Sequence, residues 1–204
     1  MDEYQSLIQI IALTMGAAWA SGINLYATVA VLGLAGTSGY VELPTTLSIV
    51  EDPLVIMAAG FMYCVEFFAD KTPGLDSGWD ALHTFIRIPA GAMLAASAVG
   101  DVAPAMTVAA GLIGGTVTAS AHVTKAGSRV LINASPEPFT NWTASVAEDL
   151  AVFAGLWAAL SHPTVFVVIM IIMLVLAIWL VPKLFRALGT LLGQVRNRFR
   201  PQAT

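Results

Sequence analysis

The chain is poor in charge. Only 11% of its 204 residues are Asp, Glu, Lys or Arg, whereas 57% are hydrophobic. About a quarter of the residues in a soluble domain are charged, so the composition excludes the soluble globular class. The length suits one membrane domain of about six spans, because each span needs roughly 20 apolar residues. We therefore expect an all-α, polytopic membrane helix bundle.

Cysteine and catalytic motifs are also scarce. The single cysteine, Cys64, cannot form an intramolecular disulfide, so it indicates no redox compartment. The sequence contains no Walker A loop, no GxGxxG, no HExxH and no GxSxG, and its three histidines lack the spacing of zinc ligands. We therefore predict no cofactor, no metal ion and no catalytic residue. Five of the nine basic residues lie in the last 22 positions, a patch too small to predict a nucleic-acid partner.

Apolar segments alternate with short polar breaks along residues 1–182, the expected membrane domain. The six predicted helical segments cover approximately residues 5–36, 53–69, 79–99, 105–132, 143–160 and 164–181. Residues 183–204 form a basic tail in which apolar side chains recur at helical spacing, which predicts an amphipathic helix on an anionic membrane surface. Its apolar positions are Leu184, Leu188, Leu191, Leu192, Val195 and Phe199. Six spans would place both termini on one side, and the basic tail assigns that side to the cytoplasm.

Two halves of the chain share faint similarity. The interrupted stretch ASGIN (20–24) corresponds to TASAH (118–122), and VEDPLVIMAAG (50–60) resembles AEDLAVFAGLW (147–157). Three helices per half would give inverted repeats over residues 5–100 and 104–182, a recurrent transporter plan with the site at the repeat interface. A GxxxG motif at residues 111–115 indicates close helix packing, either within the chain or in a homodimer.

Ionisable residues in the first half gather on two neighbouring segments. Glu66 and Asp70 are four positions apart, a spacing at which like charges need a nearby cation or a proton. Asp80, His83 and Arg87 follow at intervals of three and four, so they share one helix face. Side chains of this kind within apolar helices tend to face an interior cavity or a partner. The alternative is a structural ion-pair network.

The second half supplies a matching group. His122, Lys125 and Arg129 are three and four positions apart on one face of the fourth segment, and Glu148 and Asp149 open the fifth. The arginines suit bidentate contacts with a phosphate or carboxylate. The two acids have a simpler explanation as well, because negative charge at a helix N-terminus complements the helix dipole.

Ser21 and Asn24 interrupt the first apolar segment. A half-helix that starts there would offer N–H donors to an anion, although a small-residue packing notch explains the same pattern. We predict that an anion-binding site is formed by Ser21, Asn24, Arg87, His122, Lys125 and Arg129. We predict that a proton-coupling polar network is formed by Glu66, Asp70, Asp80, His83, Glu148 and Asp149.

Several long motifs carry a family resemblance. ASGINLYATVAVLGLAG, VEFFADKTPGLDSGWDALHTFIRIPAGAMLAA, KAGSRVLINASPEPFTNW and EDLAVFAGLW occur in this order over about residues 15–160. The chain thereby resembles the bacterial membrane proteins grouped as domain of unknown function 4126. The resemblance implies a multi-pass protein of the bacterial inner membrane and implies no activity.

From the residues themselves we expect a small inner-membrane transporter for an anionic small molecule or lipid head group, coupled to protons. One alternative is an intramembrane enzyme acting on a lipid-linked phosphate, with His83 or His122 as acid or base. A second alternative is a non-catalytic membrane scaffold. The expected partners are the lipid bilayer and the transported anion.

Overall fold

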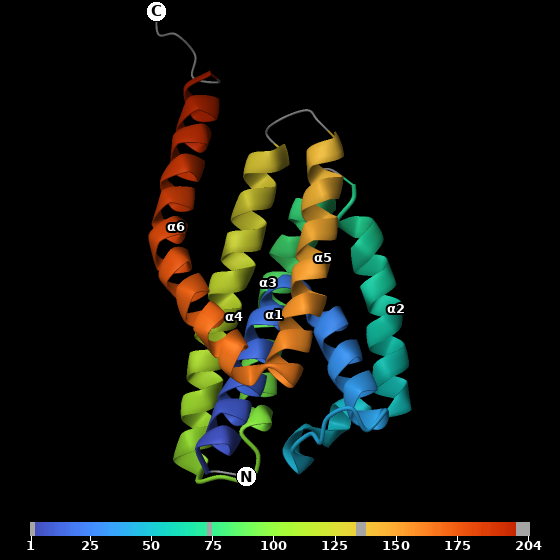
Figure 1. Ribbon diagram of the computed structural model, residues 1–204. Helices are drawn as coiled ribbons and strands as arrows, with labels where there is room; N and C mark the ends of the chain where they lie inside the picture. Colours follow the sequence, from blue (N-terminus) through green and yellow to red (C-terminus); the bar gives the residue numbers. More distant parts are fainter. Residues whose placement is uncertain (1–2, 73–74, 134–137, 199–204) are drawn as a thin grey trace, which may run out of the picture.

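The computed structural model describes residues 3–72, 75–133 and 138–198, and these residues form helices and connecting turns without any strand (Figure 1). The all-α expectation is confirmed. In chain order the elements are α1 (Glu3–Thr37), η1 (Thr45–Glu51), α2 (Pro53–Ala69), α3 (Leu75–Ala98), α4 (Pro104–Asn133), α5 (Pro138–Ser161) and α6 (Pro163–Arg198).

The described helices support a multi-pass membrane protein. By length and composition, four segments can cross a membrane: Tyr4–Thr37, Pro104–Asn133, Phe139–Ser161 and Pro163–Leu180. A fifth is added if η1 and α2, which meet at an angle of 61°, count as one span. The helix α3 does not qualify, because its first half carries Asp76, Asp80, His83 and Arg87. The described residues thus supply four or five candidate spans, in agreement with an all-α membrane helix bundle.

The helix α1 turns back on itself. Asn24 has φ −145° and ψ 97°, which breaks α1 into two arms and confirms the predicted interruption. The second arm returns to the end of the bundle where the first arm begins (Figure 1). Ser6 of the first arm and Tyr40, just beyond the second, accordingly line one shared cavity there. We call this the N-terminal end, and the opposite end the C-terminal end. Thus α1 is a re-entrant hairpin with its tip at Asn24.

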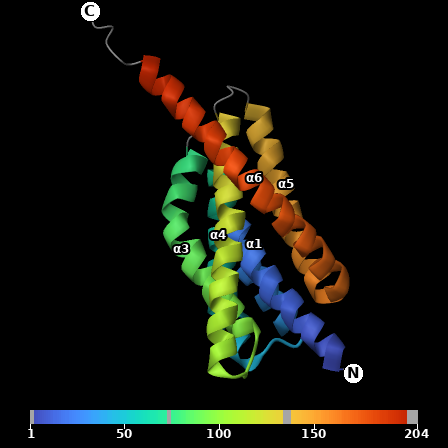
Figure 2. The same ribbon diagram turned by 90° about the vertical axis from the view of Figure 1, so that its left-hand side faces the viewer.

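The remaining helices α2 to α6 each run between the two ends of the bundle (Figures 1 and 2). Because α1 returns to its starting end, Glu3 and Arg198 lie at opposite ends. The side of the membrane that each terminus faces stays a prediction. The sequence reveals a break in the first segment but not the direction of the chain after it.

The helix α6 continues without interruption from Pro163 to Arg198, with Pro182 inside it. The expected boundary at residues 182 and 183 is therefore not a break in the helix. Lys183 places its ammonium 3.2 Å from the centre of the Trp179 ring. The apolar side chains predicted to form the amphipathic face of the tail lie outside the described residues, and its position on a membrane surface stays a prediction.

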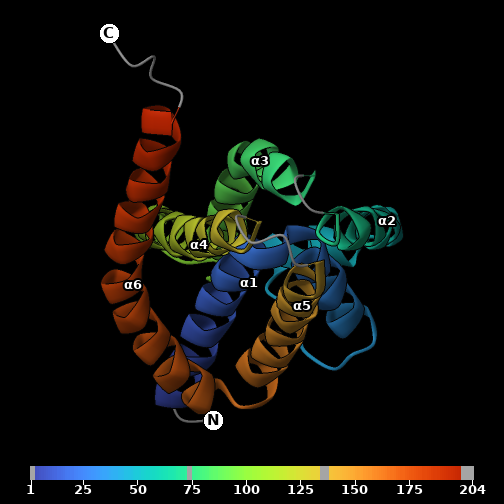
Figure 3. The same cartoon turned by 90° about the horizontal axis from the view of Figure 1, so that it is seen from above.

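Glycines allow α1 and α3 to approach α4 closely. A Cβ atom on Gly22 would lie 2.5 Å from the Thr118 carbonyl oxygen of α4, far inside van der Waals contact. Gly111 and Gly115, the GxxxG pair, face alanines of α3, so this motif is used for packing within the chain. Seen along the bundle, α1 lies between α4 and α5 (Figure 3). In an inverted repeat, α1 would correspond to α4 and α2 to α5. The helix α5 packs on α1, but the described part of α2 has no comparable contact with α4, so the repeat stays a prediction.

Candidate functional site

The ionisable residues of both halves meet inside the bundle, between the tip of α1 and the C-terminal end. Helices α1 to α5 all contribute. Eleven of the twelve predicted site residues are buried: Ser21, Asn24, Glu66, Asp70, Asp80, His83, Arg87, His122, Lys125, Arg129 and Asp149. The twelfth, Glu148, has a side chain that is 19% exposed. The geometry therefore brings the two predicted groups together, while their binding and proton roles stay predictions.

Arg87 connects α3 to α2. Its guanidinium donates to Glu66 Oε1 at 2.5 Å and to Asp80 Oδ1 at 3.0 Å, and all three side chains are at most 1% exposed. The predicted stripe on α3 explains the Asp80 contact, since positions 80 and 87 lie two turns apart on one face. A buried guanidinium without partners would cost several kcal/mol, so the two carboxylates stabilise its charge.

Lys125 is the most connected base. Its ammonium lies 2.7 Å from Asp70 Oδ2 and 3.4 Å from Glu66 Oε1. It also donates to the Ile23 carbonyl at 3.1 Å, a group that the helix break at Asn24 frees from its usual partner. Further carboxylate oxygens lie at 3.7 and 3.9 Å, on Asp80 and Glu148. Lys125 thus joins α1, α2, α3, α4 and α5 at one atom.

Arg129 closes the network toward the C-terminal end. It makes a two-point contact with Glu148, at 2.6 and 3.2 Å. It also donates to the Asp70 carbonyl at 3.2 Å and to both the carbonyl and the side-chain oxygen of Asn141. Asn141 was missed in the sequence, where an amide in a polar loop gives no signal of its own.

The ion-pair network contains one more acid than base. Its seven members are Glu66, Asp70, Asp80, Glu148, Arg87, Lys125 and Arg129. Four carboxylates and three bases give a formal charge of −1. One oxygen of Glu66, of Asp70 and of Asp80 is buried without a hydrogen-bond partner among the described groups. Asp149, beside the network, accepts a bond from Asn24 at 3.1 Å.

The two histidines are buried and form hydrogen bonds with groups inside the bundle. His83 Nε2 lies 3.1 Å from the Tyr26 hydroxyl, and its Nδ1 lies 2.9 Å from the Trp79 carbonyl. That carbonyl can only accept, so His83 carries its proton on Nδ1. Arg87 donates to His122 Nδ1 at 3.3 Å, which leaves Nε2 to donate to the Thr84 hydroxyl at 2.7 Å. His122 is therefore neutral in this arrangement, whereas the Tyr26 hydroxyl can donate to a neutral His83 or accept from a charged one.

Asn24 and Ser21 have different roles. The Asn24 side-chain oxygen accepts from the Ala27 amide at 2.9 Å, so Asn24 is the N-cap of the second arm of α1. The positive end of that arm's dipole then points at the carboxylates. Ser21 donates to the Ala18 carbonyl and lies where α1 crosses α3, next to Gly91. The geometry thus gives Ser21 a packing contact and places it outside the ion-pair network.

Lys71 lies at the C-terminal end, in the turn after α2. Its ammonium lies 2.9 Å from the centre of the Phe67 ring and donates to the Phe67 carbonyl at 3.2 Å and to the Ser145 hydroxyl at 3.4 Å. Burial is the main cause that lowers the pKa of Lys71 from its usual value. Lys71 makes no ion pair with the described residues, but the charges of Asp149 and Asp70 act on it, so it is a neighbour of the ion-pair network and not a member of it.

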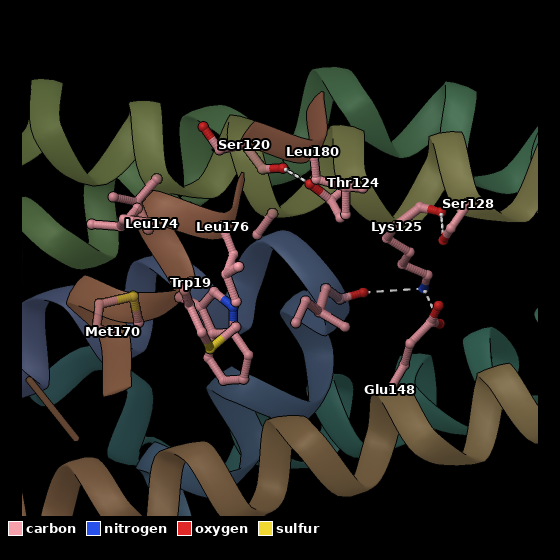
Figure 4. Close-up of a pocket in the computed structure, with 14 residues that line it drawn as sticks. Trp19, Ser120, Thr124, Lys125, Ser128, Glu148, Met170, Leu174, Leu176 and Leu180 are labelled. Atoms are coloured by element: carbon pink, nitrogen blue, oxygen red, sulfur yellow. Dashed lines mark hydrogen bonds and ion pairs between the residues drawn. The ribbon is translucent and has the colours of Figure 1, made fainter. Parts of the chain in front are cut away.

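A cavity of about 330 Å³ reaches the network from the side, between α1, α4 and α6 (Figure 4). Lys125 and Glu148 lie at one end of it, and Trp19, Met170 and Leu174 line the apolar remainder. Among the described residues, no group of three His, Cys, Asp or Glu side chains has a geometry that would hold a metal ion.

The fold and site define a class: a multi-pass helix bundle in which a re-entrant hairpin reaches a buried ion-pair network. The chain belongs to the family described as Domain of unknown function (DUF4126), whose profile matches residues 11–183. This confirms the family resemblance. Comparison with curated proteins and with solved structures gave no match.

Proposed function

We propose that the protein is a proton-coupled transporter of the bacterial inner membrane. The observation that carries the proposal is the surplus of one carboxylate in a buried network of four acids and three bases. An uncompensated charge in a membrane interior is expensive. The network therefore needs one further positive charge, which a proton or a bound substrate supplies. Competition between the proton and the substrate to supply this positive charge is the physical basis of coupling.

The re-entrant hairpin supports this proposal. Broken helices whose freed backbone groups face a central site recur in secondary transporters, and irregular backbone at membrane depth is tolerated where it is buried in protein or lines a cavity. Here the freed Ile23 carbonyl accepts from Lys125, and Asn24 donates to Asp149. A change in the charge of the network therefore acts directly on the hairpin tip.

The anionic substrate expected from the sequence needs an exchange of partners. Arg87, Lys125 and Arg129 are all engaged by carboxylates. An anion would have to displace one of these carboxylates, which would then take up a proton, and the pair would travel together. The enzyme alternative has less support, because His83 and His122 bond to Tyr26 and Thr84 rather than facing the cavity.

The distribution of basic residues supports an orientation. Lys71 and Lys183 belong to segments at the C-terminal end, while the segments that join helices at the N-terminal end, residues 38–52 and 99–103, contain no Lys or Arg. Under the positive-inside rule the C-terminal end faces the cytoplasm. The N-terminus then faces the periplasmic side.

The test is proton flux in proteoliposomes that enclose a pH-sensitive dye. Inorganic phosphate, hexanesulfonate and hexylammonium are added outside in turn. We expect at least one of them to cause a lumenal pH change that requires the wild-type protein. Glu66→Gln, which leaves three acids and three bases, should abolish that change. Glu42→Gln makes the same chemical change at an exposed site of the N-terminal end and should retain it.

Two results would contradict the proposal. A pH change of the same size in Glu66→Gln and wild type would remove the network from the mechanism. No protein-dependent pH change with any of the three solutes, in protein that remains folded and monodisperse, would favour the scaffold.

A further inference from the structure

The cavity between α1, α4 and α6 is lined by one base, Lys125, and one acid, Glu148, and the acid is the more exposed of the two. The side chain of Glu148 is 19% exposed, whereas those of Arg87 and Arg129 are 0% exposed and that of Lys125 is 2% exposed. Every base has a carboxylate partner within 3.0 Å. The charged group that a ligand meets first is therefore a carboxylate.

The hydroxyl groups along the α4 wall add to this acidic character. Ser120 donates its proton to the Thr116 carbonyl, Thr124 to the Ser120 carbonyl and Ser128 to the Lys125 carbonyl. All three hydroxyls line the cavity (Figure 4). Because their protons are already used within α4, they offer lone pairs alone to a ligand. The polar side of the cavity therefore suits a ligand that donates hydrogen bonds.

The rest of the lining is apolar and contains an aromatic ring. Trp19, Met170 and Leu174 face this space (Figure 4). Its volume of about 330 Å³ is at the small end of ligand cavities. The exposed carboxylate, the hydroxyl acceptors and the apolar lining together favour a ligand with a hydrogen-bond donor at one end and an apolar body.

We propose that this cavity binds a monovalent organic cation, a protonated amine with an apolar body, in exchange for the proton of the network. This inference rests on the proposed transport function and names its substrate class, opposite in sign to the class expected from the sequence. With a proton, the network has four acids, three bases and no net charge. When the ammonium binds and the proton leaves, the net charge is again zero. One cation therefore exchanges for one proton.

The charged groups around Glu148 are consistent with this exchange. They are Asp70 in the turn after α2, Lys125 and Arg129 from α4, and the neighbouring Asp149 on α5, with Lys71 acting on the two aspartates. The described lining residues of α6 carry no charge, and α1 contributes Trp19 and Ile23. A bound cation thus meets a carboxylate on α5 and no further charge from the described lining residues of α1 or α6.

The experiment measures proton displacement on binding to the purified full chain. Hexylammonium is titrated into detergent-solubilised protein in weakly buffered solution with a pH indicator, near neutral pH, and protein-free micelles give the blank. We expect saturable release of up to one proton per protein. Hexanesulfonate, which has the same chain length and the opposite charge, should bind no more than to the blank. An anion that displaced a carboxylate would instead cause proton uptake, so the sign of the change distinguishes the two substrate classes.

Variants locate the binding. Glu148→Gln should weaken hexylammonium binding roughly tenfold or more, because the exposed charge is lost. Leu174→Trp fills the cavity without changing any charge and should have a similar effect. Val175→Trp adds the same side chain one position away, on the exposed surface of α6, and should bind like wild type.

The failure of this inference can be told apart from failure of the transport proposal. Absence of hexylammonium binding, proton uptake with hexanesulfonate, or unchanged binding in Leu174→Trp would each overturn the cation site. The transport proposal then survives if the proteoliposome assay still gives a pH change that depends on Glu66. The transport proposal is also contradicted if the proteoliposome assay shows no protein-dependent pH change.

Discussion

The acid surplus predicts how the stability of the protein depends on pH, and Glu66→Gln isolates the effect. Glu66 Oε1 contacts Arg87 and Lys125, whereas its Oε2 has no hydrogen-bond partner among the described groups. A glutamine can keep its carbonyl oxygen at the first position and place its amide nitrogen at the second. The variant therefore has nearly the same shape and hydrogen bonds, but three acids face three bases.

The magnitude follows from the proton count. In the unfolded chain, carboxyl groups are ionised above about pH 5. If the folded network holds one proton at neutral pH, folding takes up that proton. The free energy of unfolding then falls as pH rises, by about 1.4 kcal/mol per pH unit, until the network releases the proton. Glu66→Gln removes this contribution, so its stability relative to wild type should improve by the same amount per pH unit.

The comparison between the two proteins matters more than either slope alone. The buried His83 and His122 are present in both proteins, so their own contribution to the pH dependence cancels in the difference between wild type and variant. Reversible chemical unfolding in detergent at about pH 6, 7 and 8 measures the difference. Glu42→Gln, at an exposed site, should remain parallel to wild type. Parallel lines for Glu66→Gln and wild type would refute the proton in the network.

Three further substitutions test the contacts that build the site. Asn24→Ala removes an N-cap, worth about 1 kcal/mol, and a donor to buried Asp149, worth about 1–3 kcal/mol, so chemical unfolding should show a loss of roughly 2–4 kcal/mol. Gly22→Val places a Cβ atom 2.5 Å from a carbonyl oxygen of α4, and it should lower the yield of monodisperse protein in size-exclusion chromatography. Arg87→Leu leaves buried carboxylates unpaired and should cost about 3–5 kcal/mol. A double variant with Glu66→Leu should recover part of that loss in a double-mutant cycle.

The spacing of residues along helices was enough to predict much of the site. Asp80, His83 and Arg87 lie on one face because the helical period places them there. In an apolar chain such a face turns inward, because ionisable groups are expensive against lipid. The break at Asn24 was also predictable, since Ser, Gly and Asn together favour the end of a helix. These inferences use local rules, and the structure follows them.

Other features depend on contacts between distant parts of the chain and could not be predicted. The sequence does not say that the second arm of α1 turns back, so it could not place the end of α1 (Figure 1). It does not say that Lys125 pairs with Asp70, 55 positions away. The sequence suggested free cations for an anion, whereas the packing of five helices supplies each cation with a carboxylate.

The tip of the α1 hairpin is bonded directly to charged groups at the ion-pair network. Ile23 and Asn24 are adjacent residues, yet they bond to groups of opposite charge on different helices, Lys125 on α4 and Asp149 on α5. A proton or cation added near these groups weakens the attraction between the carboxylates and Lys125. The hydrogen bond from Lys125 to the Ile23 carbonyl then changes as well. Because Asn24 interrupts the helix, the Ile23 carbonyl depends on Lys125 instead of a helical partner. One added charge at the network therefore acts directly on the residues of the helix break.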